Sequence, residues 1–206
     1  LGAAILTSGK AARRLINMVK VMVGHIPGGL PITTSASCTL FGAVSGSTQA
    51  TVAAIGGTMR PMLLEAGYSS PFSLGLIINA SDVALLIPPS IGFIVYGVVT
   101  NTSVGKLFLA GIVPGILIFL LFSAYSFVYS VTMKVGTAPK ATRKERIQAI
   151  KEGFPVLGFP LIIIGGIYTG IFSPTEAAAA AVVYALFLEG IVFRTLKWKT
   201  IVKVLL

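Results

Sequence analysis

Two short polar segments of this chain could together hold a monovalent cation. The first, Ser45–Thr48 (Ser-Gly-Ser-Thr), supplies hydroxyls, a flexible glycine and backbone carbonyls, and the second, Ile87–Ser90 (Ile-Pro-Pro-Ser), interrupts an apolar run. Because proline has no N–H, the carbonyls four residues earlier, on Ala84 and Leu85, lose their helical partners. Carbonyl and hydroxyl oxygens suit a hard cation such as Na⁺. The predicted Na⁺ site therefore consists of Ser45, Gly46, Ser47, Thr48, Ala84, Leu85, Pro88 and Ser90.

Each segment also has a purely structural interpretation. Gly42 and Gly46 have the spacing of small residues through which membrane helices pack closely. Adjacent prolines at 88 and 89 could simply kink a helix. Two prolines followed by a serine, together with a second polar segment of similar chemistry, favour the ion site over the kink.

Asp82 is the one acidic residue near the centre of an apolar run, and Asn79 precedes it by less than a helical turn. A buried carboxylate inside a membrane usually has a function. Asp82 could bind a cation or a proton, or pair with a group outside the chain. Asn79 and Asp82 are therefore the candidate coupling or substrate residues. Glu189 is instead expected to pair at an interface with Arg194.

The composition indicates that these residues lie in a membrane. Of the 206 residues, 55% are apolar and 11% are charged, and the mean hydropathy is +0.93. One soluble domain cannot bury so much apolar surface. The net charge of +10 comes from Lys and Arg in short clusters between long apolar runs. This pattern fits the positive-inside rule, so we expect contact with membrane lipid and none with nucleic acid.

Several runs approach or exceed the roughly 20 apolar residues that a membrane-spanning helix needs. They are residues 72–98, interrupted by the prolines, and residues 107–131, 154–171 and 175–193. Residues 5–23 alternate basic and apolar side chains, a pattern typical of a helix along the membrane surface. Ser173 and Glu176 flank a proline at the start of the last run and predict a capping box.

Residues 28–64 are predicted to form a re-entrant hairpin rather than a span, because their centre is small and polar. If they crossed the membrane, the basic clusters at 10–20 and 134–151 would lie on opposite sides. If they form a hairpin with its tip near Ser45–Thr48, every Lys and Arg except Lys106 lies on one side. The positive-inside rule favours the hairpin.

The predicted protein is an all-α integral membrane protein with a re-entrant helical hairpin and a broken transmembrane helix. Its predicted segments are a surface connecting helix (1–27), the hairpin (28–64), a broken helix with the following span (65–132), a cytoplasmic basic linker (133–152), and a transmembrane hairpin with the start of the next element (153–206). No Gly-rich phosphate loop and no transition-metal motif occurs. No base stands where it could activate an intramembrane serine, so an enzyme is disfavoured.

The order and spacing of these segments resemble the large membrane subunit of tripartite ATP-independent periplasmic (TRAP) transporters, the DctM-like permeases. The resemblance covers nearly the whole chain and rests on residues 41–51, 54–68, 86–91, 96–97, 103–115 and 175–179.

The resemblance implies a multi-pass subunit of the bacterial inner membrane and a Na⁺-driven symporter of elevator type, built from inverted repeats. It implies a periplasmic binding protein that delivers a small anion, a carboxylate or sialic acid, and a small membrane subunit. It places the first Na⁺ site between residues 45–48 and 84–90. Only one hairpin and one broken helix occur, so we expect roughly the first half of the subunit.

Two other interpretations remain open. A carrier of similar fold, such as a dicarboxylate carrier, could work without a binding protein. The chain could also be a scaffold subunit that docks other membrane helices and transports nothing. The carrier interpretation predicts uptake without a soluble partner. The scaffold interpretation predicts that substitutions at the polar segments change assembly but not ion-dependent uptake.

Overall fold

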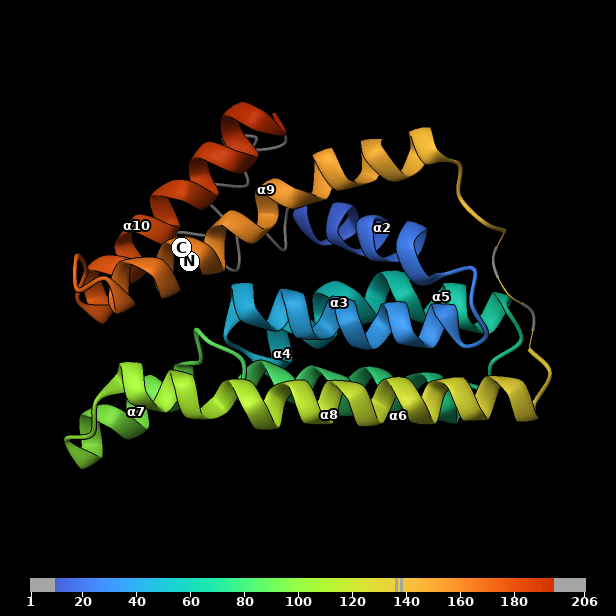
Figure 1. Cartoon of the computed structure of the whole chain (residues 1–206), viewed down its shortest axis with the longest axis horizontal. Coiled ribbons are helices and arrows are strands. Elements are labelled where there is room, and N and C mark those ends of the chain that lie inside the picture. The colour runs from blue at the N-terminus through green and yellow to red at the C-terminus, as the bar shows by residue number, and fades with distance from the viewer. Residues whose placement is uncertain (1–9, 136, 138, 195–206) are drawn as a thin grey trace.

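The computed structural model describes residues 10–135, 137 and 139–194, and every regular element in this part is a helix. Figure 1 shows the helices in layers that pack on one another in turn. The layers are α6 (Ser70–Ser81) beside α8 (Val104–Thr132), then α3 (Gly29–Ser45) with α5 (Gly57–Glu65), then α2 (Ala11–Val23), and then α9 (Arg143–Tyr168) with α10 (Pro174–Phe187).

Three of the described helices are long and apolar enough to cross a membrane: Val104–Thr132, Arg143–Tyr168 and Thr175–Val192. Apolar side chains on their outer faces are exposed, as at Val113, which is 73% exposed. Apolar side chains left open along a long helix are what a lipid-facing span requires. The prediction of an all-helical integral membrane protein is confirmed.

The start of α9 differs from the sequence prediction. The helix begins at Arg143, inside the segment predicted as a linker, and continues without a break into the span. A capping box fixes this start, because Thr142 accepts from the backbone of Glu145 and the Glu145 carboxylate accepts from Thr142. The capping box predicted at Ser173 and Glu176 is confirmed at the start of α10.

The chain turns back in the middle of residues 28–64. Helix α3 ends at Ser45 and is capped by Gly46, whose φ of 61° lies in the left-handed region that suits glycine. Ser47 is extended, and the chain then continues through α4 (Thr48–Thr51) and a π-helical turn (Val52–Gly56) into α5, which contacts α3. The placement of this hairpin in the membrane stays a prediction.

The run at 72–98 is a broken helix. Helix α6 passes into a short 3-10 helix, Asp82–Leu85, and α7 (Ile91–Thr100) begins only after a non-helical segment. We call this segment, Leu86–Ser90, the helix break. Two prolines within it lack the N–H groups that would continue the helix. Figure 1 shows α7 beyond the end of α6.

Helix α2 is amphipathic, but its apolar side packs on protein. Leu15 and Ile16 are buried in the main core cluster, and α2 contacts α3 and α9. Its first N–H groups, on Lys10 and Ala11, donate to the Glu189 carboxylate at 3.3 and 3.0 Å. The sequence predicted an interfacial position for Glu189, but the residue is fully buried and caps a helix far away in the chain.

Candidate functional site

The two polar segments predicted as a cation site meet in space. The backbone N–H of Ile91, directly after the helix break, lies 3.5 Å from the Gly46 carbonyl oxygen. A Cβ atom added to Gly46 would lie 2.7 Å from the Pro89 carbonyl oxygen, and one added to Gly42 would lie 2.8 Å from the Ala84 Cα. Glycine at 42 and 46 therefore lets the hairpin seat itself on the broken helix.

Helix α8 also packs closely on the helix break. A Cβ added to Gly111 would overlap the Leu86 carbonyl oxygen and the Phe93 ring, and one added to Gly115 would lie 2.5 Å from Ile87. The glycines at 111 and 115 are one turn apart, so α8 presents a glycine face to the helix break. The hairpin, the broken helix and α8 thus form one packed unit.

Hydroxyl groups fix the shape of the turn at residues 45–48. Thr51 Oγ1 donates to the Ser47 carbonyl at 2.8 Å and lies 2.9 Å from Ser45 Oγ. The backbone N–H of Ser47 donates to Ser45 Oγ at 3.3 Å. Thr51 is fully buried and was not predicted as a site residue. Its place in a helical stretch gave no signal that its hydroxyl would return to the turn.

Ser47 and Thr48 differ in what their hydroxyls contact. Ser47 Oγ accepts from the backbone N–H of Ala50 at 3.5 Å as the N-cap of α4, and donates to Gln49 Oε1 at 3.0 Å. Thr48 Oγ1 is buried and has no hydrogen-bond partner among the described residues. A buried hydroxyl without a partner needs an explanation such as a water or an ion. Thr48 is therefore the strongest candidate ligand at the turn.

Ser90 forms a hydrogen bond with one of the carbonyls that lose their helical partner because of the prolines. Its hydroxyl donates to the Leu85 carbonyl at 2.7 Å and accepts from the backbone N–H of Phe93 at 3.3 Å, so it caps α7. Ala84 is fully buried beside Gly42. Pro88 and Pro89 are buried too. Ser90 thus links the two halves of the broken helix, with one lone pair left on its oxygen.

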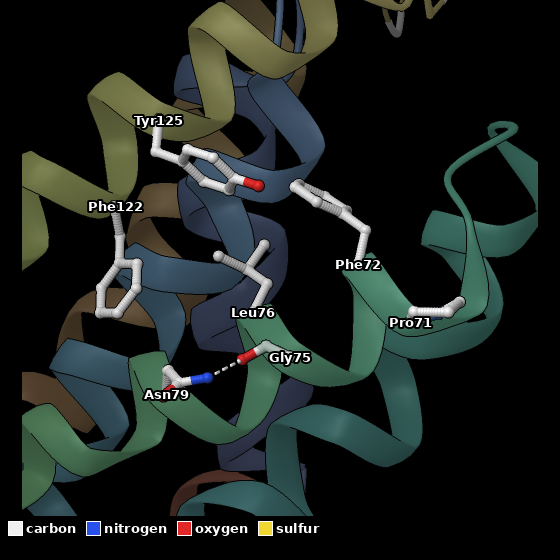
Figure 2. Close-up of a pocket in the computed structure, with 7 residues that line it drawn as sticks. All are labelled: Pro71, Phe72, Gly75, Leu76, Asn79, Phe122 and Tyr125. Carbon is white, nitrogen blue, oxygen red and sulfur yellow. Dashed lines mark hydrogen bonds between the residues drawn. The ribbon is translucent and has the colours of Figure 1, made fainter.

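Asn79 lies on α6, and Asp82 begins the 3-10 helix that contacts α3 and α4. Asn79 donates to the Gly75 carbonyl at 2.7 Å and lines a groove between α6 and α8, as Figure 2 shows. The groove holds about 240 Å³ and is lined by Pro71, Phe72, Gly75, Leu76, Asn79, Phe122 and Tyr125. Asp82 is exposed in this chain and not buried as expected, and its role in coupling or substrate binding stays a prediction. The sequence could not tell which face of the helix Asp82 would occupy.

An aromatic cluster beside this groove joins the start of α6 to the end of α8. The Phe72 and Tyr129 rings stack with centroids 4.0 Å apart, and Tyr68 stacks on Phe72 at 5.4 Å. The Tyr68 hydroxyl lies 2.7 Å from Ser130 Oγ. Aromatic stacking of this kind adds to the packing of the two helices. The sequence analysis missed the cluster, although the four-residue spacing of Tyr125 and Tyr129 was a signal for it.

The sequence matches one protein family along its whole length. This family is described as the tripartite ATP-independent periplasmic transporter, DctM component, and the match covers residues 1–206.

Three curated relatives agree with this match. The chain is 60% identical over 197 residues to an ectoine TRAP transporter large permease protein from Halomonas elongata, covering 96% of this chain and 46% of that protein. It is also 60% identical over 192 residues to an ectoine/5-hydroxyectoine TRAP transporter large permease protein from Ruegeria pomeroyi, covering 93% and 45%. Identity to a C4-dicarboxylate TRAP transporter large permease protein from Pseudomonas aeruginosa is 42% over 206 residues, covering 100% and 48%.

The chain thus spans about half the length of these curated relatives. The family match identifies a permease subunit, and the long apolar helices are those of a membrane-spanning protein. This chain belongs to the DctM family, the large permease subunits of TRAP transporters.

Proposed function

We propose that this chain is part of a Na⁺-coupled symporter of the bacterial inner membrane that imports a small organic solute bearing a carboxylate. A periplasmic binding protein delivers the solute, and a small membrane subunit completes the transporter. Ectoine is the first substrate to test, because over the aligned residues this chain is 60% identical to each of the two ectoine relatives and 42% identical to the C4-dicarboxylate relative.

The observation that carries the proposal is the buried hydroxyl of Thr48, which has no hydrogen-bond partner in the described part of the chain and begins a helix, α4, that contacts the 3-10 helix Asp82–Leu85. The residues predicted for the site offer neutral oxygens, namely the carbonyls and hydroxyls of Ser45–Thr48 and of Ala84–Ser90. Such a donor set suits Na⁺, which needs hard oxygen ligands and no thiolate or imidazole. Na⁺ binding would supply the free energy that draws the hairpin onto the helix break.

An elevator mechanism requires the ion site to move as one body. The close contacts of Gly42, Gly46 and Gly111 with the broken helix support such a body, because close-packed interfaces transmit displacement with little deformation. We infer that the hairpin, the broken helix and α8 move together against α9 and α10. The remainder of the subunit would supply a second, inverted hairpin and broken helix.

Uptake by the complete transporter in proteoliposomes tests this proposal. Labelled ectoine or a C4-dicarboxylate is offered with the binding protein under an inward Na⁺ gradient, an inward K⁺ gradient or no gradient. The proposal predicts uptake only with Na⁺ and only with the binding protein. Uptake without the binding protein would assign the transporter to the carriers that need no soluble partner. Equal uptake with Na⁺ and K⁺ would overturn the coupling.

A further inference from the structure

The guanidinium group of Arg146, near the start of α9, has two buried hydrogen-bond donors that no described residue accepts from. The residue is half-buried, and its Nε and Nη2 atoms are buried with no hydrogen-bond partner among the described residues. These two nitrogens lie on the same edge of the guanidinium group and form the fork that binds two oxygens of one anion. Leaving such buried donors unsatisfied is costly, so the geometry calls for a carboxylate or a phosphate at this edge.

The acidic side chains of this chain do not fill the fork. On α9 itself, the Glu145 carboxylate is bonded to Thr142, and Glu152 accepts from Gln148 at 3.1 Å. Of the other four, Glu176 is bonded to Ser173 and Glu189 to the first N–H groups of α2, and neither these two nor Glu65 and Asp82 accept from Nε or Nη2 of Arg146. Residues 1–9, 136, 138 and 195–206 contain no Asp or Glu. Because no carboxylate side chain of this chain fills the fork among the described residues, we look for the anion in a neighbouring molecule.

The surroundings of Arg146 resemble the boundary between headgroups and acyl chains. Basic residues Arg143, Lys144 and Lys151 share this first part of α9 and are exposed. Between them, Ile147 is 46% and Ile150 is 40% exposed, and an exposed apolar stripe continues into the span. Basic side chains beside exposed apolar ones, at the start of a membrane span, attract anionic lipid.

Arg146 also begins the face of α9 that packs on α2. Ala149, three residues further on, is buried, and a Cβ added to Gly153 would lie 2.8 Å from the Met18 Cβ. An anion held by Arg146 would therefore lie at the end of the seam between α2 and α9. Occupation of this position would strengthen the packing of both helices, since an unsatisfied cation would no longer face the seam.

We propose that Arg146 binds the phosphate group of an anionic phospholipid at the Arg143 end of α9, and that this lipid stabilises the packing of α9 on α2. The proposal needs the membrane placement of α9 but not Na⁺ coupling. It therefore stands or falls separately from the proposed transport function.

The test compares lipid binding by the complete purified transporter and by variants of α9. Native mass spectrometry counts retained phosphatidylglycerol and phosphatidylcholine molecules, and thermal unfolding is followed while each lipid is added. Arg146→Gln removes the fork, and Arg143→Gln is the matched control because it removes the same charge from an exposed position three residues away. Arg146→Lys keeps the charge and the fold but loses the bidentate geometry.

We expect phosphatidylglycerol to be retained and to raise the Tm of the wild-type protein more than phosphatidylcholine does. Arg146→Gln should weaken phosphatidylglycerol binding by about tenfold, Arg146→Lys by an intermediate factor and Arg143→Gln by no more than about twofold. Equal effects of Arg143→Gln and Arg146→Gln would overturn the site in favour of diffuse surface charge.

Two further results would also overturn the lipid assignment. If millimolar inorganic phosphate raises the Tm of the wild-type protein as much as the lipid does, the ligand is free phosphate. If Arg146→Gln leaves lipid binding unchanged but releases the small subunit during purification, the acceptor is a protein carboxylate.

Discussion

Two kinds of proline-containing helix occur in this molecule, and they behave differently. Pro114 lies inside α8, and Pro155 and Pro160 lie inside α9, yet both helices continue through them. At Pro88–Pro89 the helix ends. The difference is that adjacent prolines remove two successive N–H groups and that Ser90 provides replacement hydrogen bonds to both broken ends. A single proline is tolerated within a helix of this protein. Where the helix is interrupted, other groups have to form hydrogen bonds with the backbone carbonyls and N–H groups that lose their helical partners.

The surroundings of the two regions differ as well. Around the helix break, glycines of α3 and α8 bring backbone against backbone. The outward face of α8, by contrast, is open, with Val113 at 73% exposure. We therefore expect added volume to be harmful at the helix break and harmless along the outer faces of the spans.

The largest effect is expected for Gly46→Val. The added side chain would meet the Pro89 carbonyl at a left-handed φ of 61°, so the hairpin could no longer seat on the helix break. Strain of about 1–3 kcal/mol corresponds to a fall in Na⁺-driven uptake of roughly fivefold to a hundredfold or more. Initial uptake rates per folded transporter measure this. Gly57→Val is the control, because a Cβ at Gly57 has no neighbour within 4 Å; an equal loss there would contradict the contact.

A somewhat smaller effect, mainly on stability, is expected for Gly111→Ala. The methyl group would overlap the Leu86 carbonyl and the Phe93 ring, and such overpacking costs about 1–3 kcal/mol. Thermal unfolding of the purified transporter should show a lower Tm. Gly165→Ala in α9 adds the same methyl group with no neighbour within 4 Å. If both variants unfold at the same temperature, α8 does not press on the helix break as described.

Two serine caps sharpen the comparison further. Ser90→Ala and Ser173→Ala each remove an N-cap hydroxyl, so each should destabilise the protein by about 1 kcal/mol. Only Ser90→Ala should also reduce uptake at limiting Na⁺, because only Ser90 lies at the predicted ion site. Thermal unfolding and uptake measured on the same samples separate the two effects. If both variants lose Na⁺-driven uptake to the same degree, Ser90 has no role in Na⁺ binding beyond that of a helix cap such as Ser173.

The smallest effect is expected for Pro114→Ala. Helix α8 already continues through this proline, so its removal should leave uptake within about twofold of the wild type. Pro89→Ala is the contrasting change, since it restores an N–H where the helix is broken. Uptake assays on both variants measure the contrast. If Pro114→Ala is the more harmful of the two, the break is not the functional proline site.

The parts of the fold that follow from local chemistry could be predicted from the sequence. Pro88 and Pro89 lack the N–H groups that a helix needs, so the break was visible without coordinates. The turn was predicted from its small, polar residues and from the distribution of Lys and Arg along the chain. The capping box at Thr142 and Glu145 carried the same kind of signal and would have placed the start of α9 correctly. The charge of the segment obscured it.

Contacts between distant residues could not be predicted in this way. The Glu189 carboxylate caps α2 across 178 residues, and no local pattern links the two. The hydroxyl of Thr51 looks like that of any helical threonine until the turn brings Ser45 to it. The exposed position of Asp82 depends on which face of the 3-10 helix Asp82–Leu85 meets α3. Each of these features is decided by packing and not by the neighbours in sequence.

The central claim is that Na⁺ binds where the hairpin meets the helix break and that Thr48 Oγ1 is one of its ligands. The most direct test is the Na⁺ concentration that gives half-maximal uptake by the complete transporter. Thr48→Val keeps the shape but removes the hydroxyl and should raise this concentration by roughly tenfold or more, whereas Thr48→Ser should stay close to the wild type. Thr132→Val, which removes an exposed hydroxyl at the end of α8, is the control. The same half-maximal Na⁺ concentration in all of these proteins would contradict the claim.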